Sequence, residues 1–453
     1  QERYLDRHGV HNMTAYVSTA VAVCGQVLGR EDWLKRGLAG GKTSLREQLT
    51  TGVPGDDGFW YEGTMFYHFY SACPLITQFE LAKQTGGASS DDPEVRQRLI
   101  AMLAAPIRLA DGQGRLPLVG DLGAPGVMRL ALYRHLYEYA AGQLDAERFG
   151  PTLAALYSEQ VPRGSLTALA YGPDTLPAAK LPSGNDLLER PGFAVFRGDD
   201  QRYLLFKAGP HGAGHDHPDK LEFDLRAFGI DLACDPGTAG YALTDIHPFY
   251  RSTFCHNTLF CDEASQKEVK LAKVSADLAA RPAWAEGTVS DAYPGVSMTR
   301  RVWFDAPYVV LRDTLSSEAE HRYGWLLHAR GDYDDTVAEQ DGPKLPAIAP
   351  LAKYLTDPRE RSTAGILAAT WSLDGARLRL LVGSDGPMTI TDGTTPYNPK
   401  AMTRHTVALR AVGRVRHFYA VLEATKGEPT VKSVRLDGDA VVVTTAAGER
   451  VYR

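Results

Sequence analysis

Histidine and aspartate side chains are concentrated in one stretch of the sequence, GPHGAGHDHPDKLEFDLRAFGIDLACDPG, which spans residues 209–237. Three histidines, His211, His215 and His217, lie in its Gly- and Pro-rich beginning. A turn needs only Gly, Pro, Asn or Asp for its backbone conformation, so the histidines require a separate reason. Metal binding, proton transfer and recognition of an anionic ligand are the candidates.

Three side chains of metal-ligand type flank predicted strands. His217 precedes the strand-like segment KLEFDLRAFG, Asp235 ends the returning segment IDLACDPG, and His256 begins the strand that follows YRSTFC. Two imidazoles and one carboxylate, with a fourth position left for water, suit Zn²⁺. Taken singly, His217 is more simply a turn cap and His256 a hydrogen-bonded core histidine. The three residues together favour a zinc site.

Two further residues near this group could transfer protons. His215 lies two positions before His217, so in an extended segment both side chains point to the same side, one toward the metal and one toward a cleft. Tyr241 follows Asp235 by six residues in DPGTAGYALTD. A tyrosine in a Gly-rich loop usually packs at a rim, but a nearby cation that lowers its pKa from about 10 makes it a general base. His211, across Gly212, is expected to be exposed.

The first part of the chain has its own cluster of polar and aromatic residues. His11 and Asn12 come just before an apolar segment, and the plain interpretation of Asn12 is a helix N-cap. The segment GFWYEGTMFYHFYSACPL is rich in aromatic rings, which either pack between helices or offer faces to a sugar ring. Its polar and aromatic candidates for a site are Glu62, Tyr67, His68 and Tyr70.

Hydrophobic periodicity divides these residues between two kinds of structure. Residues 1–172 are predicted to be helical, with helices near 13–29, 31–49, 62–85, 93–109, 127–141 and 145–159. The helix at 13–29 is apolar nearly all round, which predicts that it is well buried. A Pro- and Gly-containing linker is predicted at 173–186. Residues 187–453 alternate with a period of two over ten or more segments, among them 308–316 and 322–331, and predict an antiparallel β-sandwich.

Composition limits the classes of protein to which the chain can belong. Its 453 residues exceed one ordinary core, which predicts at least two domains. A net charge of −6 argues against nucleic acid as a partner. The sequence contains no apolar run of membrane-spanning length and no signal-peptide core at its start. Because Gln1 is not an initiator Met, we expect upstream residues. Five scattered cysteines without CxxC spacing do not predict a disulfide framework.

Several of these motifs together resemble the heparinase II/III-type polysaccharide lyases, a family that includes exo-acting oligoalginate lyases. The resemblance is carried by HGAGHDHPDKLEFDL, GIDLACDPGTAGY and YRSTFCHNTLF, and by HNMTAYVSTAVAVCGQVLG and DGFWYEGTMFYHFY in the first part of the chain. It implies an α+β multidomain fold, in which an N-terminal (α/α) toroid, incomplete at its start here, is followed by a large antiparallel β-sandwich with the active cleft between them.

The resemblance also implies an activity and a role for each candidate residue. The activity is β-elimination at a uronic acid of an anionic oligosaccharide or polysaccharide. Asn12, with His11, would neutralise the uronate carboxylate, and Tyr67 would be the acid/base. His215 and Tyr241 would approach from the sheet domain, and either could be the base. A structural zinc would be held by His217, Asp235 and His256, and further substrate contacts would come from Glu62, His68, Tyr70, His211 and Arg251.

Two other functions remain open at this stage. A metal-dependent hydrolase would use the His/Asp group to activate water, and a non-catalytic protein on the same scaffold would only bind glycans. There is no GxGxxG motif between a strand and a helix, no P-loop, and no obvious carboxylate pair for glycoside hydrolysis. The sequence leaves four points undecided: the particular glycan, exo or endo attack, the compartment and the oligomeric state. A homodimer is one option for the oligomeric state.

Overall fold

A computed structural model describes residues 2–123, 126–341 and 345–453. The chain forms two compact units, each assembled from several segments. The helical unit contains Gln1–Leu116, Val127–Pro182 and Gly212–Asp216, and the sheet unit contains Pro117–Gly126, Ser183–His211 and His217–Arg453. Sequence analysis divides the chain at a single linker, whereas here a short loop from each half is grouped with the other unit.

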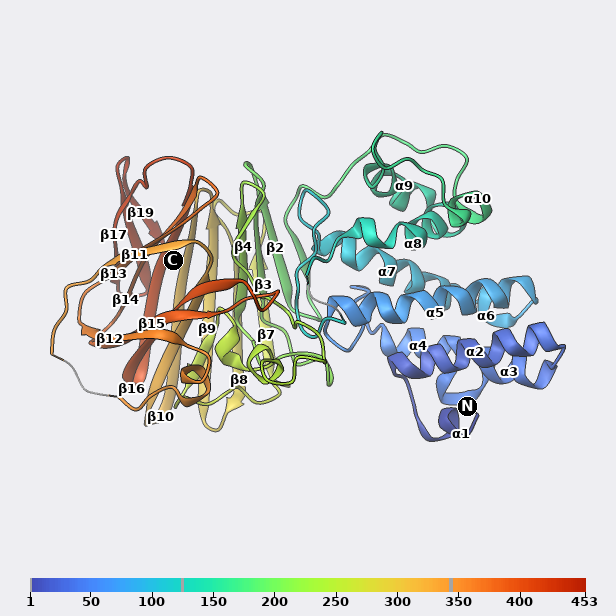
Figure 1. The fold of residues 1–453 in the computed structure, drawn as a ribbon, viewed down its shortest axis with the longest axis horizontal. Coiled ribbons are helices and arrows are strands. Elements are labelled where there is room, and N and C mark those ends of the chain that lie inside the picture. The colour runs from blue at the N-terminus through green and yellow to red at the C-terminus, as the bar shows by residue number, and fades with distance from the viewer. Residues whose placement is uncertain (1, 124–125, 342–344) are drawn as a thin grey trace. The chain divides into compact units, whose positions relative to one another are not determined.

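The helical unit is built from α-helices joined by turns and by longer loops (Figure 1). Among the described residues, no helix is both long enough and apolar enough to cross a bilayer. The helices are α1 (Glu2–Arg7), α2 (Asn12–Leu28), α3 (Glu31–Ala39), α4 (Leu45–Gly52), α5 (Met65–Gln84), α6 (Ala88–Asp91), α7 (Pro93–Leu109), α8 (Arg134–Tyr139), α9 (Ala146–Ala155) and α10 (Leu166–Tyr171).

Local sequence explains where these helices begin and end. The His11 side chain accepts a hydrogen bond from the Met13 N–H at the start of α2, and Gly29 ends that helix with a φ of 67°. Thr64 caps α5 by accepting from the Tyr67 N–H at 3.1 Å. The predicted single helix at 31–49 is wrong. It breaks into α3 and α4 around Gly40 and Gly41, where Gly41 has a φ of 58°.

The prediction that the first apolar helix is well buried is also wrong. In α2 the small residue Gly25 lies so close to the backbone of α3 at Leu34 that a Cβ atom would clash there, which fixes one buried face. The rest of the helix leaves several large apolar side chains exposed, namely Met13, Tyr16, Val23, Val27 and Leu28.

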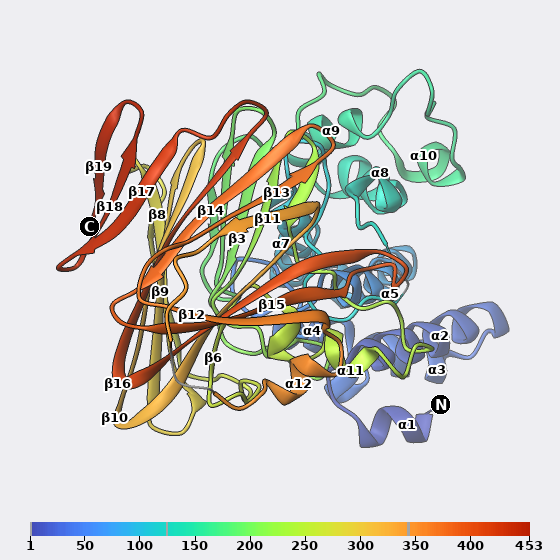
Figure 2. The same ribbon diagram turned by 60° about the vertical axis from the view of Figure 1, so that its left-hand side comes forward.

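The sheet unit contains two large antiparallel sheets and a small one (Figures 1 and 2). The five-stranded sheet has the order β1 (Asp186–Leu188), β2 (Phe193–Gly198), β3 (Arg202–Lys207), β4 (Glu222–Ala227) and β5 (Ile230–Ala233). The eleven-stranded sheet contains β6 (Leu259–Cys261), β7 (Ala272–Asp277), β8 (Ala283–Tyr293), β9 (Val296–Asp305), β10 (Tyr308–Ala329), β11 (Asp332–Thr336), β12 (Thr356–Thr363), β13 (Leu367–Leu373), β14 (Ala376–Ser384), β15 (Met388–Pro396) and β16 (Thr403–Thr425). The small sheet contains β17 (Val431–Asp437), β18 (Ala440–Thr445) and β19 (Gly448–Tyr452).

The two large sheets share one hydrophobic core, which makes the unit a sandwich. Phe206 and Phe223 of the smaller sheet belong to the same buried cluster as Trp325 and Leu409 of the larger sheet. Two strands predicted separately at 308–316 and 322–331 are one long strand, β10, with a register shift between Ser316 and His321. β10 runs beside β16 along its length, as Figure 2 shows.

The strand nearest to the predicted metal ligands is buried on both faces. In β4 every residue from Glu222 to Ala227 is buried, so Glu222, Asp224 and Arg226 lie in the interior and not in water. Buried charges of this kind require partners. This polar face of β4 is therefore where a site can be built.

Candidate functional site

The structure brings the three predicted metal ligands together in the sheet unit. Potential ligand atoms of His217, Asp219, Asp235 and His256 all lie within 4.8 Å of one another, and all four side chains are buried. His217 precedes β4, Asp235 follows β5, and His256 precedes β6, as the sequence analysis predicts. Asp219 was not among the predicted ligands.

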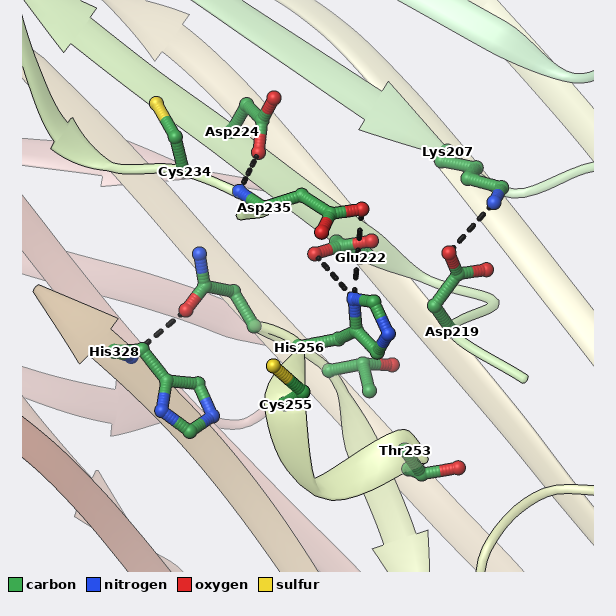
Figure 3. A network of polar contacts seen from close by, with 12 residues as sticks. Lys207, Asp219, Glu222, Asp224, Cys234, Asp235, Thr253, Cys255, His256 and His328 are labelled. Carbon is green, nitrogen blue, oxygen red and sulfur yellow. Dashed lines mark hydrogen bonds and ion pairs between the residues drawn. The ribbon is translucent and has the colours of Figure 1, made fainter. Parts of the chain in front are cut away.

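The orientation of His256 suits a ligand. Its Nε2 lies 3.1 Å from the Tyr250 carbonyl oxygen, to which it donates. Its Nδ1 faces the Glu222 carboxylate at 3.2 Å and Asp235 Oδ2 at 3.5 Å (Figure 3). Burial alone would lower the pKa of His256, but the carboxylates of Glu222 and Asp235 outweigh burial and raise it well above its ordinary value. The site therefore favours a positive charge at this position, whether a proton or a metal ion.

Asp219 differs from the other members of the group because lysines already neutralise it. Its carboxylate oxygens lie 2.6 Å from Lys207 Nζ and 3.2 Å from Lys220 Nζ, and all three side chains are buried. Burial would raise the pKa of Asp219, but the two ammonium groups hold it well below its ordinary value. Asp235, in contrast, has one carboxylate oxygen with no hydrogen bond, only the longer contact with His256. His217, Asp235 and His256 are therefore the donors best able to hold a metal.

A buried aspartate that the sequence analysis missed supports His217. Asp121 lies in the Pro117–Gly126 segment of the sheet unit, and its Oδ1 is 3.1 Å from His217 Nε2. Its Oδ2 accepts from the Tyr241 hydroxyl at 3.0 Å and from Arg251 Nη1 at 2.9 Å. An aspartate in a Gly- and Pro-rich loop is by default a turn residue, so no sequence signal distinguishes it.

Tyr241 and Arg251 are the accessible members of this second group. Tyr241 is 45% exposed, and the Arg251 side chain is 33% exposed. His247, also missed by the sequence analysis, lies with its ring centroid 5.2 Å from that of Tyr241. Burial lowers the pKa of His247, which favours its neutral form. His211 lies elsewhere in the sheet unit, half-buried, and its backbone N–H donates to the Val269 carbonyl at 2.6 Å.

In the helical unit the structure pairs Tyr67 with His215. Their rings stack with centroids 3.5 Å apart and an interplanar angle of 8°, and both side chains are half-buried. His215 lies between β3 and β4 in the chain, in the segment Gly212–Asp216, which is grouped with the helical unit. The Asp216 carboxylate accepts from the Gly212 N–H at 2.8 Å, and Gly63, with a φ of 77°, leaves room for the Asp216 side chain.

Asn12 is held by a buried carboxylate instead of acting as a helix cap. Its Nδ2 donates to both oxygens of Glu62, at 2.8 and 3.0 Å, and Trp60 Nε1 donates to the same carboxylate at 2.7 Å. Glu62 is only 1% exposed and orients Asn12 and Trp60 through these hydrogen bonds, whereas its predicted contact with substrate stays a prediction. His11 lies 3.6 Å from Glu62, with 43% of its side chain exposed.

His68, another predicted substrate contact, lies in the interior of the helical unit. The ring is fully buried, its Nδ1 accepts from the Trp60 N–H at 3.1 Å, and its Nε2 donates to the Met102 carbonyl at 2.8 Å. Burial lowers the pKa of His68 to about 4. The lowered pKa favours the neutral ring, and the predicted contact of His68 with substrate stays a prediction.

Tyr70 instead belongs to a partly exposed aromatic cluster. Its ring centroid lies 4.4 Å from that of Tyr16, 6.0 Å from that of Phe66 and 5.7 Å from that of Tyr67. Aromatic faces next to polar groups are able to bind sugar rings. The catalytic and binding roles of the residues in both units stay predictions.

Comparison with known proteins identifies the family. The model of the heparinase II/III-like C-terminal domain matches residues 182–412, about half of the chain. The chain belongs to the heparinase II/III-like family. An alginate lyase of Stenotrophomonas maltophilia (strain K279a) is 27% identical over 234 residues, which cover 44% of this chain and 31% of the relative. The chain thus spans about a third of the length of this curated relative.

Solved structures show the same fold. A heparinase III is similar with a TM-score of 0.74 and 15% identity, over 98% of this chain and 67% of the other. A second heparinase III has a TM-score of 0.72 and 16% identity, over 97% of this chain and 64% of the other. A heparan sulfate lyase from Pedobacter heparinus has a TM-score of 0.69 and 16% identity, over 100% of this chain and 67% of the other. The predicted fold class, a helical toroid-type domain followed by a large antiparallel β-sandwich, is confirmed.

Proposed function

We propose that this protein is a polysaccharide lyase that cleaves a uronic-acid-containing anionic glycan by β-elimination. The observation that carries the proposal is the stacked pair of Tyr67 and His215 in the helical unit, with ring centroids 3.5 Å apart. Both residues are partly accessible, and both are of types that transfer protons. Membership of the heparinase II/III-like family supports the same reaction class.

The reaction needs two proton transfers and no redox step. A base removes the C5 proton of the uronate, the C4–C5 double bond forms, and the C4–O bond to the leaving sugar breaks. An acid protonates the leaving oxygen. We assign the acid role to Tyr67. His215 is the better base, because the Tyr241 hydroxyl already donates its proton to Asp121.

The negative charge that develops next to C5 must be stabilised by donors near the uronate carboxylate. In the helical unit His11 is the accessible donor, and Asn12 stands beside it with its amide oriented by Glu62. In the sheet unit Arg251 provides a permanent positive charge with a partly exposed side chain. We assign carboxylate recognition to His11 and Asn12, and glycan binding to Tyr70, Arg251, Tyr241 and His211.

We propose Zn²⁺ as the ion held by His217, Asp235 and His256. The donor set is of the type zinc prefers. Each imidazole also has a partner for its other nitrogen, Asp121 for His217 and the Tyr250 carbonyl for His256, as metal-bound histidines commonly do. When bound, the ion neutralises buried carboxylates and ties together the segments that flank β4, β5 and β6.

Burial separates this proposal from the hydrolase alternative. A hydrolytic metal needs an open coordination position that a substrate can reach. The side chains of His217, Asp235 and His256 are at most 1% exposed, so the group is placed to stabilise the fold. We therefore propose a structural role for the metal.

The substrate is proposed only as a class, because relatives with different substrates share the fold. The matched sequence relative is named an alginate lyase, and a solved structure of the same fold is a heparan sulfate lyase. We propose oligosaccharides rich in uronic acid as substrates, with cleavage from chain ends, as in the exo-acting oligoalginate lyases that the motifs resemble.

The test is a panel of alginate, heparan-type and hyaluronan-type substrates, with ultraviolet absorbance of the 4,5-unsaturated product as the readout. An increase in absorbance with release of small products from the first minutes supports exo-lytic elimination. New reducing ends without a rise in absorbance mean hydrolysis, and binding without either signal means a glycan-binding protein. Early products of broad size range would contradict the exo mode alone.

A further inference from the structure

The carboxylate of Asp121 connects two groups of residues in the sheet unit. It is fully buried, its Oδ1 lies 3.1 Å from His217 Nε2, and its Oδ2 accepts from both Tyr241 and Arg251. One oxygen therefore contacts a candidate metal ligand, and the other contacts two partly exposed side chains.

The contact with His217 determines which ring nitrogen carries the proton. An ionised carboxylate only accepts hydrogen bonds, so Asp121 requires a proton on Nε2 of His217. In a neutral imidazole the lone pair is then on Nδ1. With its proton on Nε2, His217 would offer Nδ1 to a metal ion held together with Asp235 and His256, with which it forms a group of potential ligands within 4.8 Å.

The loop that carries Asp121 is held firmly enough for this purpose. The Leu122 N–H donates to Thr238 Oγ1 at 2.8 Å, and the Thr238 hydroxyl donates to the Leu122 carbonyl at 3.1 Å. Gly237, with a φ of 59°, packs so closely against Leu122 that a Cβ atom would clash. The Asp121 loop is thus fixed to the segment that leads from Asp235 to Tyr241.

We propose that Asp121 is a positioning residue that sets the tautomer of His217 for metal binding and, with its other oxygen, orients Tyr241 and Arg251 for the glycan. The glycan part rests on the proposed lyase function, whereas the metal part does not. Removal of the carboxylate charge should therefore weaken metal binding in the absence of any substrate.

The experiment compares the wild type with Asp121→Asn and with a matched control, Asp392→Asn. Asp392 is also a fully buried carboxylate of the sheet unit, and it accepts from one histidine and two arginines, His405, Arg359 and Arg361. Zinc affinity is measured by competition with a chromophoric chelator. We expect Asp121→Asn to lose about 10–100-fold in zinc affinity, and Asp392→Asn to bind zinc like the wild type.

Two further measurements keep the proposal testable if Asp121→Asn folds poorly or if no active substrate is found. In wild-type protein labelled with ¹⁵N-histidine, the chemical shifts of His217 should report a proton on Nε2, and a proton on Nδ1 alone would overturn the proposal.

On an active substrate at saturating zinc, KM of Asp121→Asn should rise about tenfold with kcat nearly unchanged. Zinc affinity equal to that of Asp392→Asn would refute the metal part, and absent turnover on all uronates would refute only the lyase function.

Discussion

Replacing Tyr67 with phenylalanine separates proton transfer from packing. The change removes one hydroxyl and keeps the ring that stacks on His215 at 3.5 Å and 8°, so the ~0.5–1.5 kcal/mol associated with an aromatic pair is retained. Loss of a hydroxyl hydrogen bond costs ~0.5–1.5 kcal/mol of unfolding free energy. Loss of a general acid lowers kcat by ~10²–10⁴-fold, which corresponds to ~2.7–5.4 kcal/mol in the barrier. The effect on the rate should exceed the effect on stability.

The assay is kcat from the ultraviolet absorbance of the unsaturated product, with melting temperature and oligouronate affinity measured on the same samples. Tyr70→Phe is the matched control, because Tyr70 lies on the same helix with its ring centroid 5.7 Å from that of Tyr67. We expect the control to retain kcat within a few-fold. His215→Ala should lose both the stacking energy and the rate. A Tyr67→Phe enzyme with kcat close to wild type would refute the assignment, whatever the outcome for the fold or the metal.

Three other predictions follow from the buried groups. Asn12→Ala should lower the unfolding free energy by ~1.5–3 kcal/mol, because the Glu62 carboxylate loses charged hydrogen bonds. The same variant should have a lower kcat. A variant that melts like the wild type would contradict the observed contact between Asn12 and Glu62. Elemental analysis should find one zinc per chain, and removal of the zinc should lower the melting temperature. The expected loss of unfolding free energy is ~4 kcal/mol relative to protein with free zinc at a thousandfold excess over Kd. Because the pKa of His68 is lowered to about 4, the unfolded state binds the extra proton, so stability should fall as pH decreases from about 6.5 to 4; His68→Gln should remove this part of the slope in chemical denaturation curves.

Hydrophobic period predicted the change from helices to strands, but not the continuity of individual elements. The segment 31–49 was predicted as one helix, yet the helix ends before Gly40 and Gly41, because glycine adopts conformations such as the φ of 58° at Gly41 at little cost. The predicted strands 308–316 and 322–331 are one strand, β10, because a bulge absorbs the polar residues between them without ending the pairing with β16. Hydrophobic periodicity reflects the local conformational preference of the chain. Hydrogen-bonded pairing with a long partner strand determines where a strand ends.

The candidate site was predictable where residues flank strand ends and unpredictable where partners are distant in sequence. His217, Asp235 and His256 could be grouped because each flanks a predicted strand, although β4 and β5 belong to the five-stranded sheet and β6 to the eleven-stranded sheet. Asp121 lies 96 residues before His217 in a loop of turn-type composition, and only tertiary structure places it there. The same limit applies to Asn12, which had a complete local explanation as an N-cap, while its actual partner, Glu62, is 50 residues away.

His215 and His217 belong to one short segment, although proton transfer is proposed for His215 and metal binding for His217. They are two residues apart, and in an extended strand both side chains would point to the same side. The residues between His211 and Lys220 instead form turns, so alternation does not apply. His215 stacks on Tyr67 in the helical unit, while His217 is buried against Asp121 in the sheet unit. Since the covalent chain limits how far His215 can move from His217, an ion that fixes His217 also restricts the backbone that carries the proposed base. If the proposed zinc and the proposed base are both correct, loss of the buried ion would therefore lower turnover without any contact between the ion and the glycan.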